Sequence, residues 1–232
     1  MKSKKNRIWE LDAFRGVCIL AVVALHLLFD LKVYSGLRIL DHPVMQAVNT
    51  AVGISFVVLS GLCITLGSRP LRRGLEVFFC AMAITAVTWS MAKLNFLHPG
   101  MVIRFGVLHL LGVCMLLWPL FKKLPTGVLA VLGLAIILLG HWFETLTVTP
   151  GWLFPLGLAS RGFSSGDYFP LAPHLGWFFL GAVLGRMVYK EKRSIFPDVS
   201  KSPAFLCWCG RHSLLIYLVH QPVLYGIVSL LT

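Results

Sequence analysis

The chain has 232 residues, of which 57% are hydrophobic and only 13% are charged, and its mean hydropathy is +0.82. This apolar content lies above that of soluble domains. The long uncharged runs exclude a soluble globular fold, because a membrane-spanning helix needs about 17–25 such residues and the chain contains several runs of that length. The sequence therefore predicts an integral membrane protein. Its net charge of +12 needs a separate explanation.

Apolar segments long enough to cross a bilayer recur along the whole chain. In order, these seven are residues 12–32, 47–67, 74–92, 102–121, 125–143, 172–189 and 212–231. Residues 146–171, rich in Gly, Pro and Ser, are expected to form a loop that partly re-enters the membrane. No repeat or shift in composition divides the sequence. We predict an all-α polytopic membrane helical bundle of about seven helices, forming a single domain over residues 1–232.

The basic residues explain the net charge by their distribution. With the N-terminus in the cytoplasm, fifteen of them lie inside: Lys2, Lys4, Lys5, Arg7, Arg69, Arg72, Arg73, Lys122, Lys123, Arg186, Lys190, Lys192, Arg193, Lys201 and Arg211. Only Lys32, Arg38, Lys93, Arg104 and Arg161 lie outside, and Arg15 falls within the first span. This positive-inside bias predicts a cytoplasmic N-terminus and an outer C-terminus in a multi-pass protein of the cytoplasmic membrane. The charge is topogenic, so nucleic acid is not an expected partner.

The cysteines do not indicate a metal site. All six cysteines of the chain lie in or at the ends of the predicted spans. Cys207-x-Cys209 has no second Cys/His pair at a zinc-like spacing, so we expect apolar packing and no bound metal. Glycines within several spans, such as Gly61, Gly181 and Gly185, are expected to let helices approach closely.

The first predicted span carries four polar side chains on one face. Taking Arg15 as zero and about 100° per residue, Asp12 and Asp30 lie near 60° and His26 near 20°. A charge at the centre of a membrane helix costs at least ~2.5–3.5 kcal/mol, so this face must turn toward a polar cavity or partners within the bundle. Asp12 can pair with Arg15, and His26 can touch Asp30.

His26 is the strongest candidate for chemistry, because imidazole exchanges a proton near neutral pH and a carboxylate beside it can orient the ring. The structural alternative is a packed histidine bonded to a backbone carbonyl. Other spans contribute further polar groups. Arg104 lies at the predicted outer end of the fourth span with His109 further in, and Asp167 and His174 lie at the outer start of the sixth. Ser213, Tyr217 and His220 share one face of the last span, and together these groups predict a cavity that opens outward.

Several ordered motifs carry a family resemblance. Arg7-x-x-Glu-Leu-Asp12-x-x-Arg15-Gly16 is followed by His26-x-x-x-Asp30, "FVVLSGLCITLG", "RFGVLHLLGV" and "GRHSLLIYLVHQP". They resemble the catalytic domain of heparan-alpha-glucosaminide N-acetyltransferase and its prokaryotic relatives, over nearly the whole chain. The beginning is also similar to the wider superfamily of transmembrane acyltransferases, in which a first-span Asp-x-x-Arg-Gly precedes a histidine.

The resemblance implies transfer of an acetyl group from cytosolic acetyl-CoA to an amine or hydroxyl, such as that of a sugar, at the outer side. His26 would be the base, Asp30 its orienting group, and Arg104 or His109 the oxyanion donor. Basic residues would hold the CoA: Arg15, Arg69, Arg72, Arg73, Lys122 and Lys123. The acceptor would be bound by Asp167, His174, Tyr217 and His220. Direct transfer and an acetyl-histidine route both stay open.

Other readings of the same residues remain at this point. A transporter of a small anion or sugar could use His26 and Asp30 as a proton relay, and a non-catalytic membrane subunit could keep the fold alone. In animal lysosomal members of the family, the position of His26 holds asparagine and the proposed catalytic histidine lies in the following loop, where this chain has His42. The sequence also leaves a homodimer open.

Overall fold

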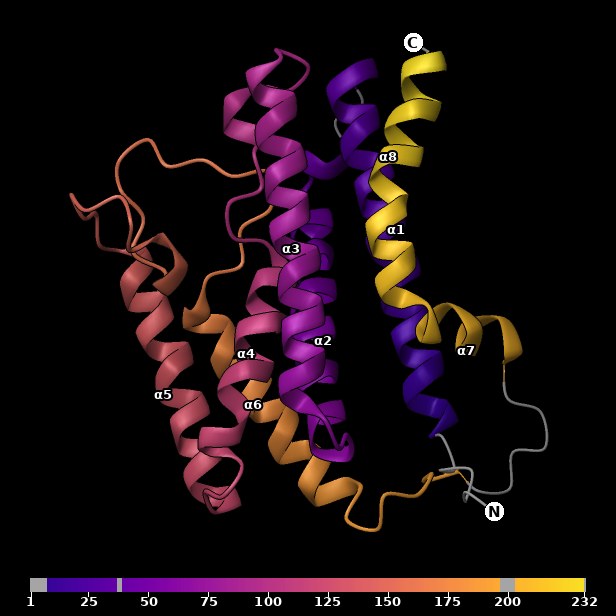
Figure 1. Cartoon of the computed structure of the whole chain (residues 1–232), viewed down its shortest axis with the longest axis vertical. Helices are drawn as coiled ribbons and strands as arrows, with labels where there is room; N and C mark the ends of the chain where they lie inside the picture. Colours follow the sequence, from indigo (N-terminus) through magenta and orange to yellow (C-terminus); the bar gives the residue numbers. More distant parts are fainter. Residues whose placement is uncertain (1–7, 37–38, 197–202, 232) are drawn as a thin grey trace. The chain divides into compact units, whose positions relative to one another are not determined.

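The structure is a computed structural model that describes residues 8–36, 39–196 and 203–231. These residues form eight α-helices: α1 (Trp9–Ser35), α2 (Pro43–Leu66), α3 (Pro70–Lys93), α4 (Val107–Phe121), α5 (Thr126–Glu144), α6 (Leu171–Val188), α7 (Ala204–Arg211) and α8 (Ser213–Leu231) (Figure 1). Six residues counted for the orientation lie outside the described residues: Lys2, Lys4, Lys5, Arg7, Arg38 and Lys201.

The all-helical membrane fold predicted from the sequence is confirmed. Each predicted span falls largely on one of the helices α1 to α6 or on α8. Among the described residues, α1, α2, α3, α5 and α6 are long and apolar enough to cross a membrane, while α4 and α8 are apolar but shorter. The exact count of spans and the cytoplasmic position of the N-terminus stay predictions.

The fourth predicted span begins too early. The sequence placed its start at residue 102, but α4 starts at Val107. The preceding residues are held extended, because Ile103 N donates to Thr88 Oγ1 at 3.2 Å and Phe169 N donates to Phe105 O at 2.9 Å. Hydrogen bonds to distant segments therefore keep this apolar stretch out of the helix.

The chain divides into two compact units. Unit 1 comprises residues 1–56 and 189–232, and unit 2 comprises residues 57–188. The chain passes from one to the other within α2 and again after α6.

Unit 1 is organised around α1, which packs against α7 and α8. At the crossing of α1 and α7, two glycines remove the side chains that would separate the backbones. A Cβ on Gly16 would overlap the carbonyl oxygen of Leu206, and one on Gly210 would overlap that of Asp12. Small residues at such contacts replace the hydrophobic driving force that is missing in lipid. Gly16 of the Asp-x-x-Arg-Gly motif thus belongs to a helix contact.

Unit 2 pairs α3 with α4 and α5 with α6. The part of α2 in this unit packs on α6 through glycines that alternate between the two helices. Gly61 contacts the backbone at Phe178, while Gly181 and Gly185 contact the backbone at Val58 and Leu62. The close helix contacts expected at these glycines are confirmed.

We predict that Gly16→Ala destabilises the protein by about 1–3 kcal/mol, because the added methyl group has to push the α7 backbone away from α1. The comparison is Gly226→Ala in α8, where no atom of the described residues, apart from the helix's own neighbouring backbone, lies within 4 Å of the position that a Cβ would take. Unfolding of the detergent-solubilised variants by increasing SDS measures the difference. Equal stability of the two variants would contradict the described crossing.

Candidate active site

A polar cluster of two buried and two half-buried side chains joins α1 to α8 in unit 1. We call it the α1–α8 cluster, and it consists of His26, Asp30, His220 and Gln221. His26 and Asp30 are four residues apart, so they lie one turn apart on the same face of α1. Asp30 is 4% exposed and His220 is 8% exposed. Groups of this kind are costly inside an apolar bundle unless they find partners.

Asp30 finds its partner on the other helix. The Gln221 side-chain amide donates from Nε2 to Asp30 Oδ1 at 2.9 Å and to Oδ2 at 3.1 Å. Because Nε2 faces the carboxylate, Oε1 of the same amide has to point elsewhere. Among the described residues no hydrogen bond joins Asp30 to His26, so Gln221 rather than His26 holds the carboxylate.

The two histidines have tautomers fixed by backbone carbonyls. His26 Nδ1 lies 2.9 Å from the carbonyl oxygen of Val22, and His220 Nδ1 lies 2.6 Å from that of Tyr217. A carbonyl only accepts, so each Nδ1 carries the proton and each neutral ring keeps a lone pair on Nε2. The ring centroids of His26 and His220 are 4.8 Å apart in an edge-to-face arrangement.

The carbonyl bond expected of a merely packed histidine is therefore present at His26, but it occupies only one ring nitrogen. The same bond fixes which nitrogen can accept a proton. The sequence analysis expected Asp30 to orient the His26 ring. In the structure the Val22 carbonyl oxygen orients it.

Two atoms of this cluster lack a partner within the described part of the chain. They are His220 Nε2 and Gln221 Oε1, both fully buried. Buried polar atoms are rarely left without hydrogen bonds, and each exception needs an explanation. Both atoms are acceptors, so whatever satisfies them has to bring hydrogen-bond donors.

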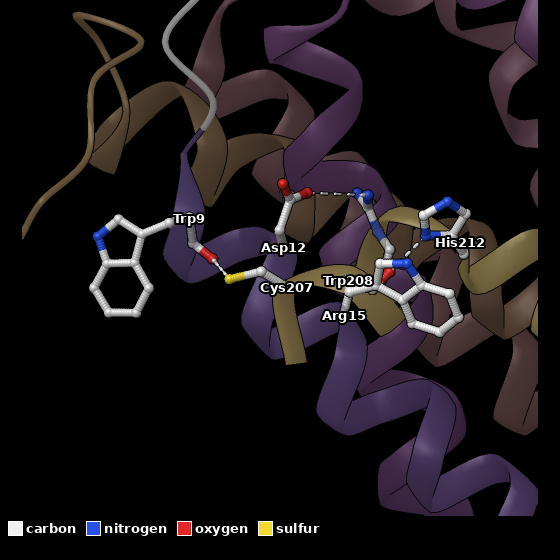
Figure 2. A network of polar contacts seen from close by, with 6 residues as sticks. All are labelled: Trp9, Asp12, Arg15, Cys207, Trp208 and His212. Atoms are coloured by element: carbon white, nitrogen blue, oxygen red, sulfur yellow. Dashed lines mark hydrogen bonds and ion pairs between the residues drawn. The ribbon is translucent and has the colours of Figure 1, made fainter. Parts of the chain in front are cut away.

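The other end of the first-span stripe meets α7. Arg15 Nη1 lies 3.9 Å from Asp12 Oδ1, so this pairing predicted from the sequence is confirmed. Figure 2 shows the pair beside α7, where the His212 ring is bonded back to the Trp208 carbonyl oxygen at 2.9 Å. Both members of the ion pair are partly buried, which favours a structural role at this crossing.

His109 in unit 2 has a different setting from His26. Its Nδ1 accepts from the Gly106 backbone N–H at 3.2 Å, and its Nε2 lies 3.1 Å from Thr85 Oγ1. The Thr85 hydroxyl donates to Ile103 O at 2.7 Å, so it accepts from His109. Both ring nitrogens are thus occupied, and the neutral ring ties α3 to the start of α4.

Asp167 and Arg104 also lie at the start of α4. Asp167 Oδ2 accepts from the Val107 backbone N–H at 3.0 Å, and therefore caps the helix. Arg104 is exposed, its backbone N–H donates to Ser165 Oγ at 3.1 Å, and its guanidinium lies 5.7 Å from the Phe163 ring centroid.

Nearby, Tyr168 donates its hydroxyl to Phe154 O at 2.6 Å, and burial raises the pKa of Tyr168 to about 12. Its phenol is therefore neutral at physiological pH. The loop before α6 is held by these polar contacts.

The remaining acceptor candidates lie in different units. His174 of unit 2 has Nδ1 2.8 Å from Pro170 O, in the first turn of α6. Tyr217 of unit 1 lies beside His220, with ring centroids 5.3 Å apart.

The basic residues proposed for CoA gather at one end of unit 2. Gly74 near the start of α3 contacts Leu116 near the end of α4, so the turns α2–α3 and α4–α5 lie at the same end. These turns carry the exposed side chains of Arg69, Arg72, Arg73, Lys122 and Lys123. Arg72 is paired with Glu76 at 2.9 Å. The sixth candidate, Arg15, belongs to unit 1.

Arg186, which the sequence analysis did not single out as a site residue, stabilises this end of unit 2. Its guanidinium donates to Leu124 O at 2.6 Å and to Lys122 O at 2.9 Å, and lies over the Trp118 ring. The carbonyls at the end of α4 are thereby satisfied by a cation, which also suits the helix dipole.

Comparison with known proteins identifies the fold's family. The family model described as heparan-alpha-glucosaminide N-acetyltransferase, catalytic, matches residues 7–222. The chain belongs to this family. No curated protein and no solved structure matches it. The resemblance carried by the ordered motifs is confirmed, and both the α1–α8 cluster and the start of α4 lie inside the matched region of this acetyltransferase catalytic family.

The described residues of this family member contain no group of three or more His, Cys, Asp or Glu side chains that could hold a metal ion. No disulfide joins any two of the described cysteines. Cys207 donates to the Trp9 carbonyl oxygen at 3.5 Å, a packing contact between α7 and α1 (Figure 2).

Gln221 is the site residue that sequence reasoning missed. It was noted only as part of Gln221-Pro222, a point where the last helix was expected to be distorted. The available signal was that a buried carboxylate at Asp30 needs a donor, and that a glutamine amide within an apolar span also needs hydrogen-bond partners.

We predict that Asp167→Ala lowers the stability of unit 2 by about 0.5–2 kcal/mol, the usual cost of a lost helix cap. Asp167→Asn should recover most of this loss, since an amide oxygen can still accept from Val107 N–H. The melting temperatures of the purified variants measure both effects. Equal losses in the two variants would show that Asp167 does not act as the cap.

Proposed function

We propose that the protein transfers an acetyl group from acetyl-CoA to an amine or hydroxyl acceptor within the membrane, with His26 as the base. Membership of the acetyltransferase catalytic family supports the reaction type. The observation that supports the choice of base is the Val22 carbonyl bond, which puts the proton of His26 on Nδ1 and leaves Nε2 to accept another. The transporter alternative receives no support from the family match.

The competing base, His42, has the opposite tautomer. Its Nδ1 accepts from the Val44 backbone N–H at 3.3 Å, so the neutral ring carries its proton on Nε2. In that arrangement the His42 side chain caps the beginning of α2 through Nδ1. Its other ring nitrogen, Nε2, carries a proton and can only donate. His26 and not His42 therefore presents a free lone pair.

In the proposed reaction, acetyl-CoA supplies an acetyl carbon bound to a thiolate leaving group. His26 Nε2 takes the proton of the acceptor as its nitrogen or oxygen bonds to that carbon, and the bond to sulfur breaks with its electron pair leaving on sulfur. The imidazolium then returns the proton to the thiolate. Direct attack by Nε2, giving an acetyl-histidine, uses the same lone pair.

The basic end of unit 2 has the chemistry that CoA phosphates need. Arg69, Arg72, Arg73, Lys122 and Lys123 are exposed cations on adjacent turns. Guanidinium and ammonium groups bind phosphate through charge-assisted hydrogen bonds. With the positive-inside orientation, this end faces the cytosol, where acetyl-CoA is available, and the protein resides in the cytoplasmic membrane. Arg15 and the acceptor-binding roles of Asp167, His174 and Tyr217 stay predictions.

We predict that His26→Ala lowers acetyl transfer by at least about a hundredfold, the usual contribution of a general base. The assay follows labelled acetyl from acetyl-CoA to glucosamine in detergent-solubilised protein, and melting temperatures verify folding. His42→Ala tests the competing base, and His141→Ala, at an exposed position on α5, is the neutral control. If folded His26→Ala retained turnover and His42→Ala lost it, the base would be His42, in the segment between α1 and α2.

We predict that the double variant Arg72→Gln/Arg73→Gln raises the Kd for CoA by about tenfold or more, because each lost charge-assisted bond costs about 1.5–3 kcal/mol. Isothermal titration with CoA measures this change. Lys93→Gln, at the opposite end of α3, is the matched control. An unchanged Kd would place the nucleotide site elsewhere.

A further inference from the structure

The short helix α7 has an exposed face that neither the fold nor the proposed acetyl transfer uses. Phe205 is 65% exposed, Trp208 is 49% exposed, and Arg211 is exposed as well. At about 100° per residue, these three side chains lie within one arc of about 120°. The buried residues Cys207 and Gly210, which contact the backbone of α1, lie on the other side of the helix. The exposed face is therefore aromatic and carries a cation at its end.

The polar groups of this face are donors without acceptors in the described part of the chain. None of the ion pairs formed there includes Arg211. The Trp208 ring lies beside the His212 ring, with centroids 4.6 Å apart (Figure 2), while its indole N–H makes no hydrogen bond to a described residue. Guanidinium and indole N–H groups only donate, so a partner of this face has to bring acceptors.

The position of α7 along α1 fits the boundary of a bilayer. Gly16 and Gly210 mark the crossing of the two helices, and the ion pair of Asp12 and Arg15 lies next to it (Figure 2). From Gly16 to the end of α1 at Ser35, the helix rises roughly 29 Å at 1.5 Å per residue. The hydrocarbon core of a bilayer is about 30 Å thick. With α1 across the membrane, α7 lies where the polar headgroups begin.

The same end of α1 holds further cations. Glu10 accepts from the Ile195 backbone N–H at 2.8 Å, and the Trp9 indole donates to Phe196 O at 3.3 Å. These bonds hold the segment that follows α6 against the beginning of α1. Its exposed cations are Lys190, Lys192 and Arg193. Basic groups at the membrane surface attract anionic lipids, so the charge at this end is complementary to such lipids.

We propose that α7 is an interfacial helix whose exposed face binds an anionic phospholipid at the leaflet that meets the beginning of α1. Arg211 pairs with the lipid phosphate. Trp208 places its ring at the headgroup level, with its N–H donating to a lipid oxygen, and Phe205 enters the adjoining acyl region. With the positive-inside orientation, this leaflet is the cytoplasmic one. The assignment concerns lipid binding and does not depend on the proposed reaction.

The test measures which lipid lies beside Trp208. The full chain is reconstituted in vesicles of phosphatidylcholine and phosphatidylglycerol, with bromine, which quenches indole fluorescence, on one lipid or the other at equal mole fraction. The difference between the wild type and Trp208→Phe isolates the Trp208 signal. We expect brominated phosphatidylglycerol to associate about fivefold more strongly than brominated phosphatidylcholine, the contribution of one cation near an anionic surface. Trp142, 59% exposed on α5 and isolated in the same way, should show no preference.

Substitution of Arg211 tests the assigned phosphate contact. In Arg211→Gln the preference should fall to about onefold, whereas Arg211→Lys should keep most of it. Arg161→Gln, at an exposed position in the loop before α6, is the control that retains it. A measurement at 1 M NaCl needs no variant and should also remove the preference, because the screening length is then about 3 Å. Absence of quenching at Trp208, equal quenching by the two lipids, or a preference that survives both Arg211→Gln and 1 M NaCl would overturn the proposal.

Discussion

The hydrogen bonds between Gln221 and Asp30 are the interaction on which unit 1 depends. An unpartnered carboxylate inside an apolar bundle costs several kcal/mol, whereas a hydrogen bond to a charged group contributes about 1.5–3 kcal/mol. Since the two residues are 191 positions apart, this contact joins the first helix to the last. It sets the register of α8 on α1, and through that register it places His220 beside His26. The glycine crossing of α1 and α7 fixes the other end of the same helix.

Three histidines show how partners, rather than residue type, decide what a ring can do. His109 has both nitrogens occupied and holds the beginning of α4 against α3. In His26 and His220, Nδ1 forms a hydrogen bond to a backbone carbonyl oxygen. The other nitrogen, Nε2, stays available for chemistry or binding. In unit 2 an amide and a hydroxyl together occupy both ring nitrogens, so that histidine is structural. In unit 1 a single carbonyl partner occupies only Nδ1 of each ring.

Much of the fold followed from simple patterns. Long apolar runs predicted the helices, and the period of about 3.6 residues placed Asp12, Arg15, His26 and Asp30 on one face. The Asp12–Arg15 pair was predictable because both residues lie on one helix. Periodicity identifies the face that needs a partner, but not the partner itself. Gln221 as the donor to Asp30 and Asp167 as the cap of α4 both come from distant segments, so only the folded chain shows them. The short helix α7 was missed for a related reason, since eight residues give too little period to recognise.

The role of His26 as the base requires an unprotonated Nε2 on its ring. Nitrogen-15 NMR of protein labelled at histidine tests it directly at neutral pH, with the His26→Gln variant used to assign the signal. We predict a neutral ring with its proton on Nδ1 and an unprotonated Nε2 for His26. A signal assigned to His26 with the proton on Nε2 and a bare Nδ1 would contradict the Val22 bond, and with it the role of His26 as the base.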